Sequence, residues 1–224
     1  MERDAYFIVK QVENTMNRYD MLNGCNRVIV ALSGGADSVC LLSVLLNLAK
    51  RFRIQIEAAH VNHHLRGEAS NEDERFVREL CRKWGVPLTV KEADIKKVCM
   101  ERKISMEEAG RDVRYAFFDE LTRGVPDVRI ATAHNRNDNA ETLIMHFLRG
   151  AGVDGMAGIP YIRGKIIRPI LDLTRDQVEK YDRLMSLAFV TDETNRENVV
   201  TRNRIRNQLL PQLEREYNLN IVQT

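Results

Sequence analysis

A short segment of serines, glycines and one aspartate lies between an apolar run and a helical pattern. It reads SGGADS, from Ser33 to Ser38. Gly34 and Gly35 let backbone amides approach an anion without interference from a Cβ atom. The helix that follows offers unpaired N–H groups at its positive N-terminus, and both serine hydroxyls can donate hydrogen bonds to phosphate oxygens. The segment therefore predicts a phosphate-binding turn.

Asp37 is the unusual member of this segment, because a carboxylate repels a neighbouring phosphate. It fits such a turn if Mg²⁺ lies between the two groups, so Asp37 is the candidate metal ligand. The segment is not a Walker A motif, since no lysine lies in the turn. A GxGxxG string occurs at Gly150, Gly152 and Gly155, but it follows a helical pattern rather than a strand and does not predict a dinucleotide site. An ordinary turn between strand and helix is the alternative interpretation of SGGADS.

Further charged residues recur at helical spacing. Asp138 and Glu141 are three positions apart and would share one face of a helix. Residue types alone leave open whether this pair is a site or a solvated helix start, where acidic side chains interact favourably with the helix dipole. Two arginine pairs have similar spacing and also fit solvated helix faces: Arg111 with Arg114, and Arg202 with Arg206.

Short apolar strands alternate with amphipathic helices along the chain. Strands are predicted at Arg27–Ser33, Ile54–Val61, Val86–Glu92 and Val128–His134, and Tyr161–Ile170 is either one strand or a hairpin turning at Arg163 and Gly164. Helices are predicted at Phe7–Tyr19, from the glycine-rich turn to about Lys50, at Asn71–Trp84, Asp94–Arg102, Ser105–Thr122 and Asn137–Arg149, after Thr174, and from Arg202 to about Tyr217. Asn71 and Glu74 have the spacing of a capping box at the start of their helix. This alternation is typical of an α/β fold, a Rossmann-like parallel sheet with helices on both faces.

Composition excludes several classes of protein. Of 224 residues, 44% are apolar, which is enough for a core, and the net charge is only +2. That charge excludes a histone-like polycation but allows a local basic face for RNA. No apolar run reaches the roughly 18 residues of a membrane span, and the charged N-terminal residues MERDAYFIVK lack the apolar stretch of a signal peptide. A cytoplasmic protein without a membrane partner is therefore expected. The four cysteines, Cys25, Cys40, Cys81 and Cys99, form no CxxC pair, which argues against a local zinc or iron–sulfur site.

SGGADS resembles the PP-loop of the ATP-pyrophosphatase superfamily, whose enzymes cleave ATP between the α and β phosphates and adenylate an oxygen of a second substrate. Further segments, in this order, resemble the tRNA(Ile)-lysidine synthetases, and the resemblance extends from about Arg27 to Pro211. These segments are HVNHHLRGEASNEDE (His60–Glu74), MEEAGRDVRYAFF (Met106–Phe118), TAHNRNDNAET (Thr132–Thr142), RGAGVDGMAGIP (Arg149–Pro160), RPIL (Arg168–Leu171) and DETNRENVVTRNRIRNQLLP (Asp192–Pro211).

The resemblance implies an ATP-dependent ligase. Such enzymes join the ε-amine of L-lysine to C2 of the wobble cytidine in an isoleucine tRNA with a CAU anticodon. ATP first adenylates the C2 carbonyl oxygen with release of pyrophosphate; lysine then attacks C2 and AMP leaves, because AMP is a better leaving group than a carbonyl oxygen. ATP and Mg²⁺ are the implied cofactors, and the family suggests a homodimer.

Residue roles follow from the matched motifs. Asp37, Asp138 and Arg114 are the implied catalytic residues, with Asp138 as a base or a partner of Mg²⁺. Glu141 is expected to hold the ammonium group of lysine, and Arg206 its carboxylate or a phosphate, since a planar guanidinium suits both. ATP binding is expected from Ser33, Gly34, Gly35, Ala36, Asp37, Ser38, His60, Asn62 and His134.

The whole chain is expected to form one PP-loop catalytic domain. Its parts are an N-terminal helix in residues 1–24, a core in 25–160, and a flap with a C-terminal helix that closes the site in 161–224, with C-terminal tRNA-binding domains missing. Two alternatives stay open: a PP-loop tRNA thiolase and a non-catalytic nucleotide-binding protein. Related thiolases generally carry paired cysteines, and a nucleotide sensor would have little use for Asp138, Glu141 and Arg206.

Overall fold

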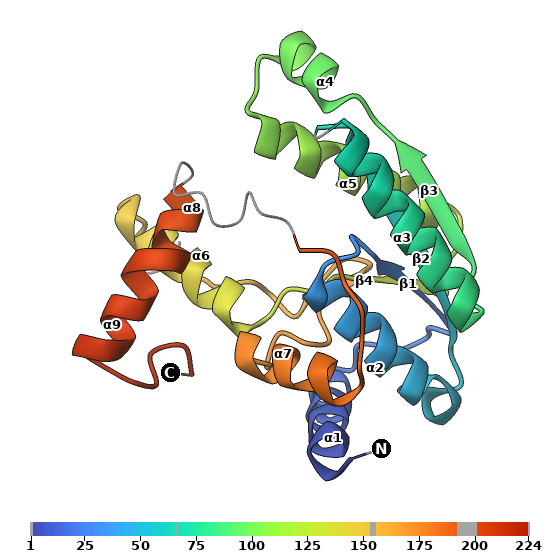
Figure 1. Cartoon of the computed structure of the whole chain (residues 1–224), viewed down its shortest axis with the longest axis horizontal. Helices are drawn as coiled ribbons and strands as arrows, with labels where there is room; N and C mark the ends of the chain where they lie inside the picture. The colour runs from blue at the N-terminus through green and yellow to red at the C-terminus, as the bar shows by residue number, and fades with distance from the viewer. Residues whose placement is uncertain (1, 66, 153–155, 192–200, 224) are drawn as a thin grey trace.

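The structure is a computed structural model that describes residues 2–65, 67–152, 156–191 and 201–223. Within these ranges the chain folds around a sheet of six strands in the order β3-β2-β1-β4-β6-β5 (Figure 1). All neighbouring strands are parallel except β5, which pairs antiparallel with β6. The strands are β1 (Arg27–Ala31), β2 (Gln55–Asn62), β3 (Leu88–Glu92), β4 (Val128–Ala131), β5 (Ile162–Arg163) and β6 (Ile166–Ile167). The predicted Rossmann-like sheet is confirmed, and the open choice at Tyr161–Ile170 is resolved as a hairpin.

The helices match the predicted positions closely. They are α1 (Arg3–Arg18), α2 (Ala36–Phe52), α3 (Glu68–Trp84), α4 (Ile95–Arg102), α5 (Met106–Thr122), α6 (Arg136–Leu148), α7 (Arg175–Leu184), α8 (Thr201–Arg204), the π-helix η3 (Ile205–Leu209) and α9 (Leu210–Glu216). The predicted helix from Arg202 to about Tyr217 is thus helical but contains a π turn. Gly155 of the GxGxxG string and residues 192–200 of the segment Asp192–Pro211 lie outside the described residues.

The predicted start of α3 at Asn71 is wrong. The helix begins at Glu68 after Gly67, whose φ of +58° favours glycine. Asn71 and Glu74 form no capping box; both side chains instead accept hydrogen bonds from the Asn62 amide, at 3.3 and 2.9 Å. These acceptors tie the first turns of α3 to the end of β2.

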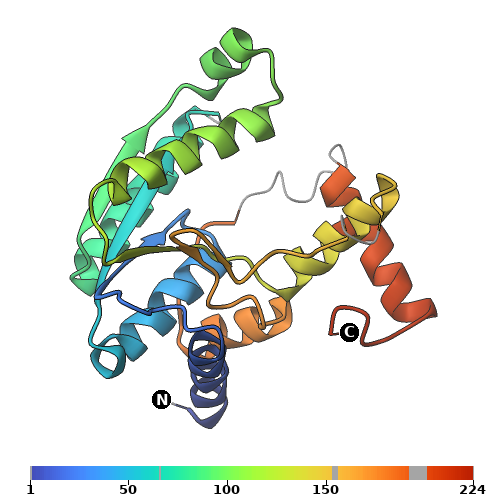
Figure 2. The ribbon, with the colours of Figure 1, turned by 180° about the vertical axis from the view of Figure 1, so that it is seen from behind.

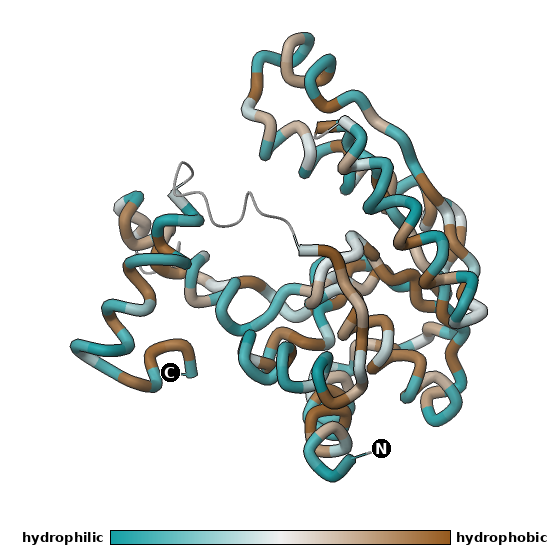
Figure 3. Tube along the Cα trace, in the orientation of Figure 1, coloured by the Kyte–Doolittle hydropathy of each residue, from teal (hydrophilic) through white to brown (hydrophobic). Residues whose placement is uncertain are grey.

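The sheet separates two apolar clusters. Val28 and Val30 of β1 pack on one face with α1, α2, α3 and α7, whereas Ile29 packs on the other face with Phe117 and Phe118 of α5. This alternation follows from the two-residue period of a strand. In Figure 3 brown, apolar stretches run along the central strands and hydrophilic residues, in teal, dominate the outer helix α3.

The order of the strands reverses at β1. Strands β2 and β3 extend the sheet on one side of β1, and β4 lies on the other. The loops that follow β1 and β4 therefore meet at the carboxyl edge of the sheet, where the strand order reverses and where open α/β sheets bind ligands. Seen from behind in Figure 2, α6 and α9 extend outward from this edge, away from α5. Among the described residues, no helix is long and apolar enough to cross a membrane.

Candidate active site

The turn after β1 has the compact geometry that the SGGADS segment predicts. Gly34 has a φ of +93°, and a Cβ there would lie 3.2 Å from Val77, so a larger residue would be strained. The Ser38 hydroxyl donates to the Gly35 carbonyl at 2.9 Å and accepts from the Gly34 amide at 3.2 Å. Ser33 Oγ lies 3.1 Å from Ser38 Oγ. The two serines thus hold the turn closed, and α2 begins directly after it at Ala36.

Asp37 links this turn to the loop after β4. Its Oδ1 accepts a hydrogen bond from Asn135 Nδ2 at 2.8 Å, and its Oδ2 lies 3.8 Å from Arg175 Nη2. The pKa of the Asp37 carboxyl is raised, first because it is buried and second by the negative charge of Asp138. Two carboxylates therefore repel each other beside the turn, which is a location that favours a cation.

Asn135 and Asp138 fix the start of α6. The Asn135 side chain accepts from the Asp138 amide at 3.1 Å, and the Asp138 side chain accepts from the Asn135 amide at 3.0 Å, which is a capping box. Asn135 is fully buried. Sequence reasoning did not single it out, although a cap residue three positions before an acidic residue is a recognisable signal.

Asp138 and Glu141 share one face of α6, as their spacing predicts, and both contact two arginines from the other end of the chain. Arg206 Nε lies 2.5 Å from Glu141 Oε1, and its Nη2 lies 2.9 Å from Asp138 Oδ1. Arg202 Nε lies 2.8 Å from Glu141 Oε2, and its Nη2 lies 3.3 Å from Asp138 Oδ1. Glu141 is fully buried. We call these four residues the acid–arginine cluster. Arg202 belongs to it equally, whereas the motif resemblance assigns a specific role only to Arg206.

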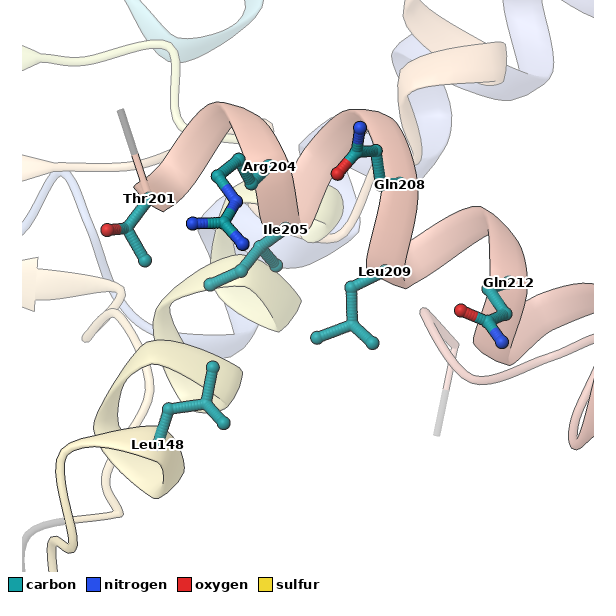
Figure 4. A pocket seen from close by; sticks show the side chains of 7 residues that line it. All are labelled: Leu148, Thr201, Arg204, Ile205, Gln208, Leu209 and Gln212. Carbon is teal, nitrogen blue, oxygen red and sulfur yellow. The ribbon is translucent and has the colours of Figure 1, made fainter. Parts of the chain in front are cut away.

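The helical segment from Thr201 to Glu216 positions the two arginines. Ile205 and Leu210 are buried and anchor the segment. The same segment borders a hollow against α6 (Figure 4). The hollow is lined by Leu148, Thr201, Arg204, Ile205, Gln208, Leu209 and Gln212. It includes none of the cluster's four side chains.

Two of the predicted ATP-binding residues are histidines held neutral, of which His60 is buried and His134 is half-buried. His60 Nδ1 lies 2.8 Å from the Leu32 carbonyl oxygen, and because a carbonyl can only accept, Nδ1 carries the hydrogen. Burial lowers the pKa of His60. His134 Nδ1 lies 3.1 Å from Thr132 Oγ1, and burial is the main reason that its pKa is lowered to about 4.

Asn62 and Arg114 are placed differently from the cluster. The Asn62 side chain is buried and hydrogen-bonded within the protein, as donor to α3 and as acceptor from the His64 amide at 3.0 Å. Arg114 is exposed on α5, and in the described part of the chain it forms no ion pair with Asp138 or Glu141. Its charge contributes to the lowered pKa of His134, after burial and other neighbours. The functional roles assigned to Asn62 and Arg114 stay predictions.

A profile of the PP-loop domain matches residues 7–213. The chain therefore belongs to the PP-loop domain family. This match covers the turn, α6 and both arginines of the acid–arginine cluster.

Its curated relatives include proteins that share one name. A tRNA(Ile)-lysidine synthase of Clostridium perfringens is 46% identical over 216 residues, which cover 96% of this chain and 46% of that protein. The protein of the same name from Bacteroides thetaiotaomicron is 43% identical over 189 residues, which cover 84% of this chain and 43% of that protein. The chain thus spans about half the length of the curated relatives it matches.

A solved structure with the same fold is the U34-tRNA thiolase NcsA from Methanococcus maripaludis, described with its 4Fe-4S cluster. It has a TM-score of 0.79 and 17% sequence identity, and the match covers 98% of this chain and 77% of that one. At that identity the likeness shows the fold alone.

Proposed function

We propose that this chain is the catalytic part of an ATP-dependent ligase that forms lysidine in an isoleucine tRNA with a CAU anticodon. The observation that carries the proposal is the acid–arginine cluster beside the PP-loop, joined to it by the hydrogen bond from Asn135 to Asp37. A nucleotide-binding module needs the loop alone. The additional buried acids suit a reaction that also takes up a cationic amine, and the name of the curated relatives supports the same reading.

ATP is bound in this proposal with its phosphates on the turn. The amide hydrogens at the start of α2 and the hydroxyls of Ser33 and Ser38 face the phosphate oxygens. His60, Asn62 and His134 lie near the adenosine. The neutral state of the two histidines leaves them free to accept or donate hydrogen bonds without adding charge.

Mg²⁺ fits the donor set on the protein side. Asp37 and Asp138 repel each other, and Mg²⁺ is commonly held by one or two carboxylates together with substrate phosphates. Among the described residues, no group of three or more His, Cys, Asp or Glu is placed to hold a metal ion. When bound, the metal neutralises charge on the phosphates.

Asp138, Glu141 and Arg206 of the cluster take part in the two steps of the proposed reaction. The C2 oxygen of cytidine attacks the α-phosphate and pyrophosphate leaves; the lysine ε-amine then attacks C2, AMP leaves, and Asp138 accepts the proton from the amine. Glu141 binds the ε-ammonium before attack. Because a buried carboxylate needs a cationic partner, the guanidinium of Arg206 holds Glu141 until lysine arrives and then turns to the carboxylate of lysine. Arg114 contacts the cytidine.

The organisation of the chain is part of the proposal. Residues 1–24, 25–160 and 161–224 form a single catalytic domain, and the additional length of the relatives supplies tRNA-binding domains. We also propose that the enzyme is a cytoplasmic homodimer.

The experiment is incorporation of radiolabelled lysine into a transcript of CAU-anticodon isoleucine tRNA, with ATP and Mg²⁺. Label in the RNA that depends on ATP is the expected result, and Asp138→Asn should abolish it while its circular dichroism stays that of the wild type. A transcript with a GAU anticodon is the control and should remain unlabelled. Transfer of sulfur instead of lysine would favour the thiolase suggested by the fold of NcsA. Binding of ATP with neither product would favour a nucleotide sensor.

A further inference from the structure

Two arginines from distant parts of the chain lie over one tyrosine ring. The Cζ atom of Arg111, on α5, lies 5.4 Å from the centroid of the Tyr115 ring, and the Cζ atom of Arg163, on β5, lies 6.0 Å from it. Both arginines are exposed and Tyr115 is half-buried. The ring is fixed from below, because it packs with Phe118, the buried neighbour on α5, at a centroid distance of 6.0 Å.

The charge around this ring is uncompensated. Arg114 and Arg168 also interact electrostatically with Tyr115, and in the described part of the chain none of the four arginines forms an ion pair with a carboxylate. Arg168 is 3% exposed; its Nη1 donates to the Pro160 carbonyl at 2.5 Å, and its Nε is buried without a hydrogen-bond partner. Burial lowers the pKa of Arg168, and the charges of Arg163 and Arg111 lower it further. Four neighbouring cations without acids are unfavourable for the free protein, so the arrangement favours an anionic ligand.

We propose that Arg111 and Arg163, aligned on the Tyr115 ring, form a clamp for the RNA backbone next to the reaction site. A guanidinium that lies over an aromatic ring is attracted by the negative face of the ring, which holds its N–H donors in a fixed direction. A planar fork of donors matches the oxygens of a phosphodiester. Tyr115 is therefore a positioning residue, and the two arginines contact the ligand.

The location of the clamp favours RNA over a free nucleotide. Arg114 and Arg168, which border the clamp, both act on the charge state of His134 at the carboxyl edge of the sheet. The clamp is built on α5 and on β5, the last strand at one edge of the sheet, while the PP-loop follows β1 and leads into α2. Three strand spacings separate β5 from β1, roughly 14 Å at about 4.8 Å each, and an extended RNA strand can span that separation. The inference rests on the proposed function, because it places the substrate RNA of that reaction.

The test measures RNA binding separately from catalysis. A fluorescent anticodon stem-loop with a CAU anticodon is titrated with the protein at salt concentrations between about 50 and 200 mM, and the slope of log K against log salt is determined. Arg111→Gln and Arg163→Gln should each reduce the slope by about 0.7–0.9, the contribution of one phosphate contact. Arg82→Gln is the matched control and should leave the slope unchanged, because Arg82 is exposed on α3, which packs on the other face of the sheet from α5 and Tyr115.

Variants of the ring separate positioning from general damage. Tyr115→Leu should weaken RNA binding about fivefold or more, whereas Tyr115→Phe, which keeps the ring, should bind as the wild type does. ATP affinity should be unchanged in both. In turnover, the KM for tRNA should rise in Tyr115→Leu while kcat at saturating tRNA stays near the wild-type value.

Opposite outcomes contradict the clamp in distinguishable ways. Unchanged slopes in both arginine variants would overturn it, as would equal losses in Tyr115→Phe and Tyr115→Leu. A wild-type chain that binds the RNA with the expected slope yet incorporates no lysine would contradict the proposed function and leave the clamp standing. Lysine incorporation with an unaltered KM for tRNA in all clamp variants would contradict the clamp and support the proposed function.

Discussion

Asp182 on α7 is a buried carboxyl whose protonation should affect the stability of the fold. Its side chain is 2% exposed, and neither carboxyl oxygen has a hydrogen-bond partner among the described residues. The pKa of this carboxyl is raised to about 7, mainly by burial and further by the charges of Asp37 and Glu179. We predict that Asp182→Asn stabilises the fold, and more so as pH rises.

The magnitude follows from proton linkage. The pKa rises from the ordinary value of 3.8 to about 7, which at about 1.4 kcal/mol for each unit corresponds to at most about 4 kcal/mol. The folded state keeps its proton up to about pH 7, whereas the unfolded chain loses it near pH 3.8. The free energy of unfolding of the wild type therefore falls as pH rises through this window. Above about pH 7 the wild type remains destabilised by the whole of this free energy, whereas the side chain introduced in Asp182→Asn does not ionise and that variant is not destabilised.

The assay is urea unfolding of both proteins at several pH values between about 4 and 8. The advantage of Asp182→Asn should grow by about 1.4 kcal/mol for each pH unit below pH 7 and then level off. Asp176→Asn, in the exposed first turn of the same helix, is the matched control and should show no such trend. An advantage independent of pH, or an Asn variant less stable at pH 8, would refute the reasoning.

Three further variants probe the site itself. Glu141→Ala should lower the free energy of unfolding, measured with urea, by about 2 kcal/mol. This is less than the roughly 3–5 kcal/mol lost when a fully buried pair is broken, because the Arg206 side chain is 21% exposed. Glu141→Gln should mainly raise the KM for lysine, and an unchanged KM would contradict the role of Glu141. Gly34→Ala should cost about 1–3 kcal/mol because of the positive φ and should weaken ATP binding in calorimetry; normal affinity would show that the turn tolerates a Cβ. Asn135→Ala should cost about 1 kcal/mol as a lost helix cap and lower AMP formation, whereas wild-type turnover would exclude its part in holding Asp37.

The order and limits of the core elements could be predicted because they depend on local patterns. The apolar strand Arg27–Ala31, for example, lies within its predicted range, and Thr174 caps α7 as the sequence indicated. The start of α3 could not be predicted, because the side-chain amide of Asn62, which lies outside the helix, donates hydrogen bonds to the side chains of Asn71 and Glu74. A capping pattern identifies potential acceptors, but a tertiary donor decides where they bond.

The site was predictable in its residues but not in its pairing. Spacing placed Asp138 with Glu141 on one face, and likewise Arg202 with Arg206. That the two pairs meet requires a contact across about 60 residues of sequence, which local periodicity does not encode. A local capping pattern can identify Asn135 as a helix cap, but not its bond to Asp37, which spans 98 positions.

AMP release is the measurement that tests the central claim most directly. The chain is incubated with ATP and Mg²⁺, and AMP and pyrophosphate are quantified with and without CAU-anticodon isoleucine tRNA, each with and without lysine. The account predicts AMP release that requires tRNA and rises with lysine, and its loss in Asp138→Asn. AMP release that is the same without tRNA would contradict it.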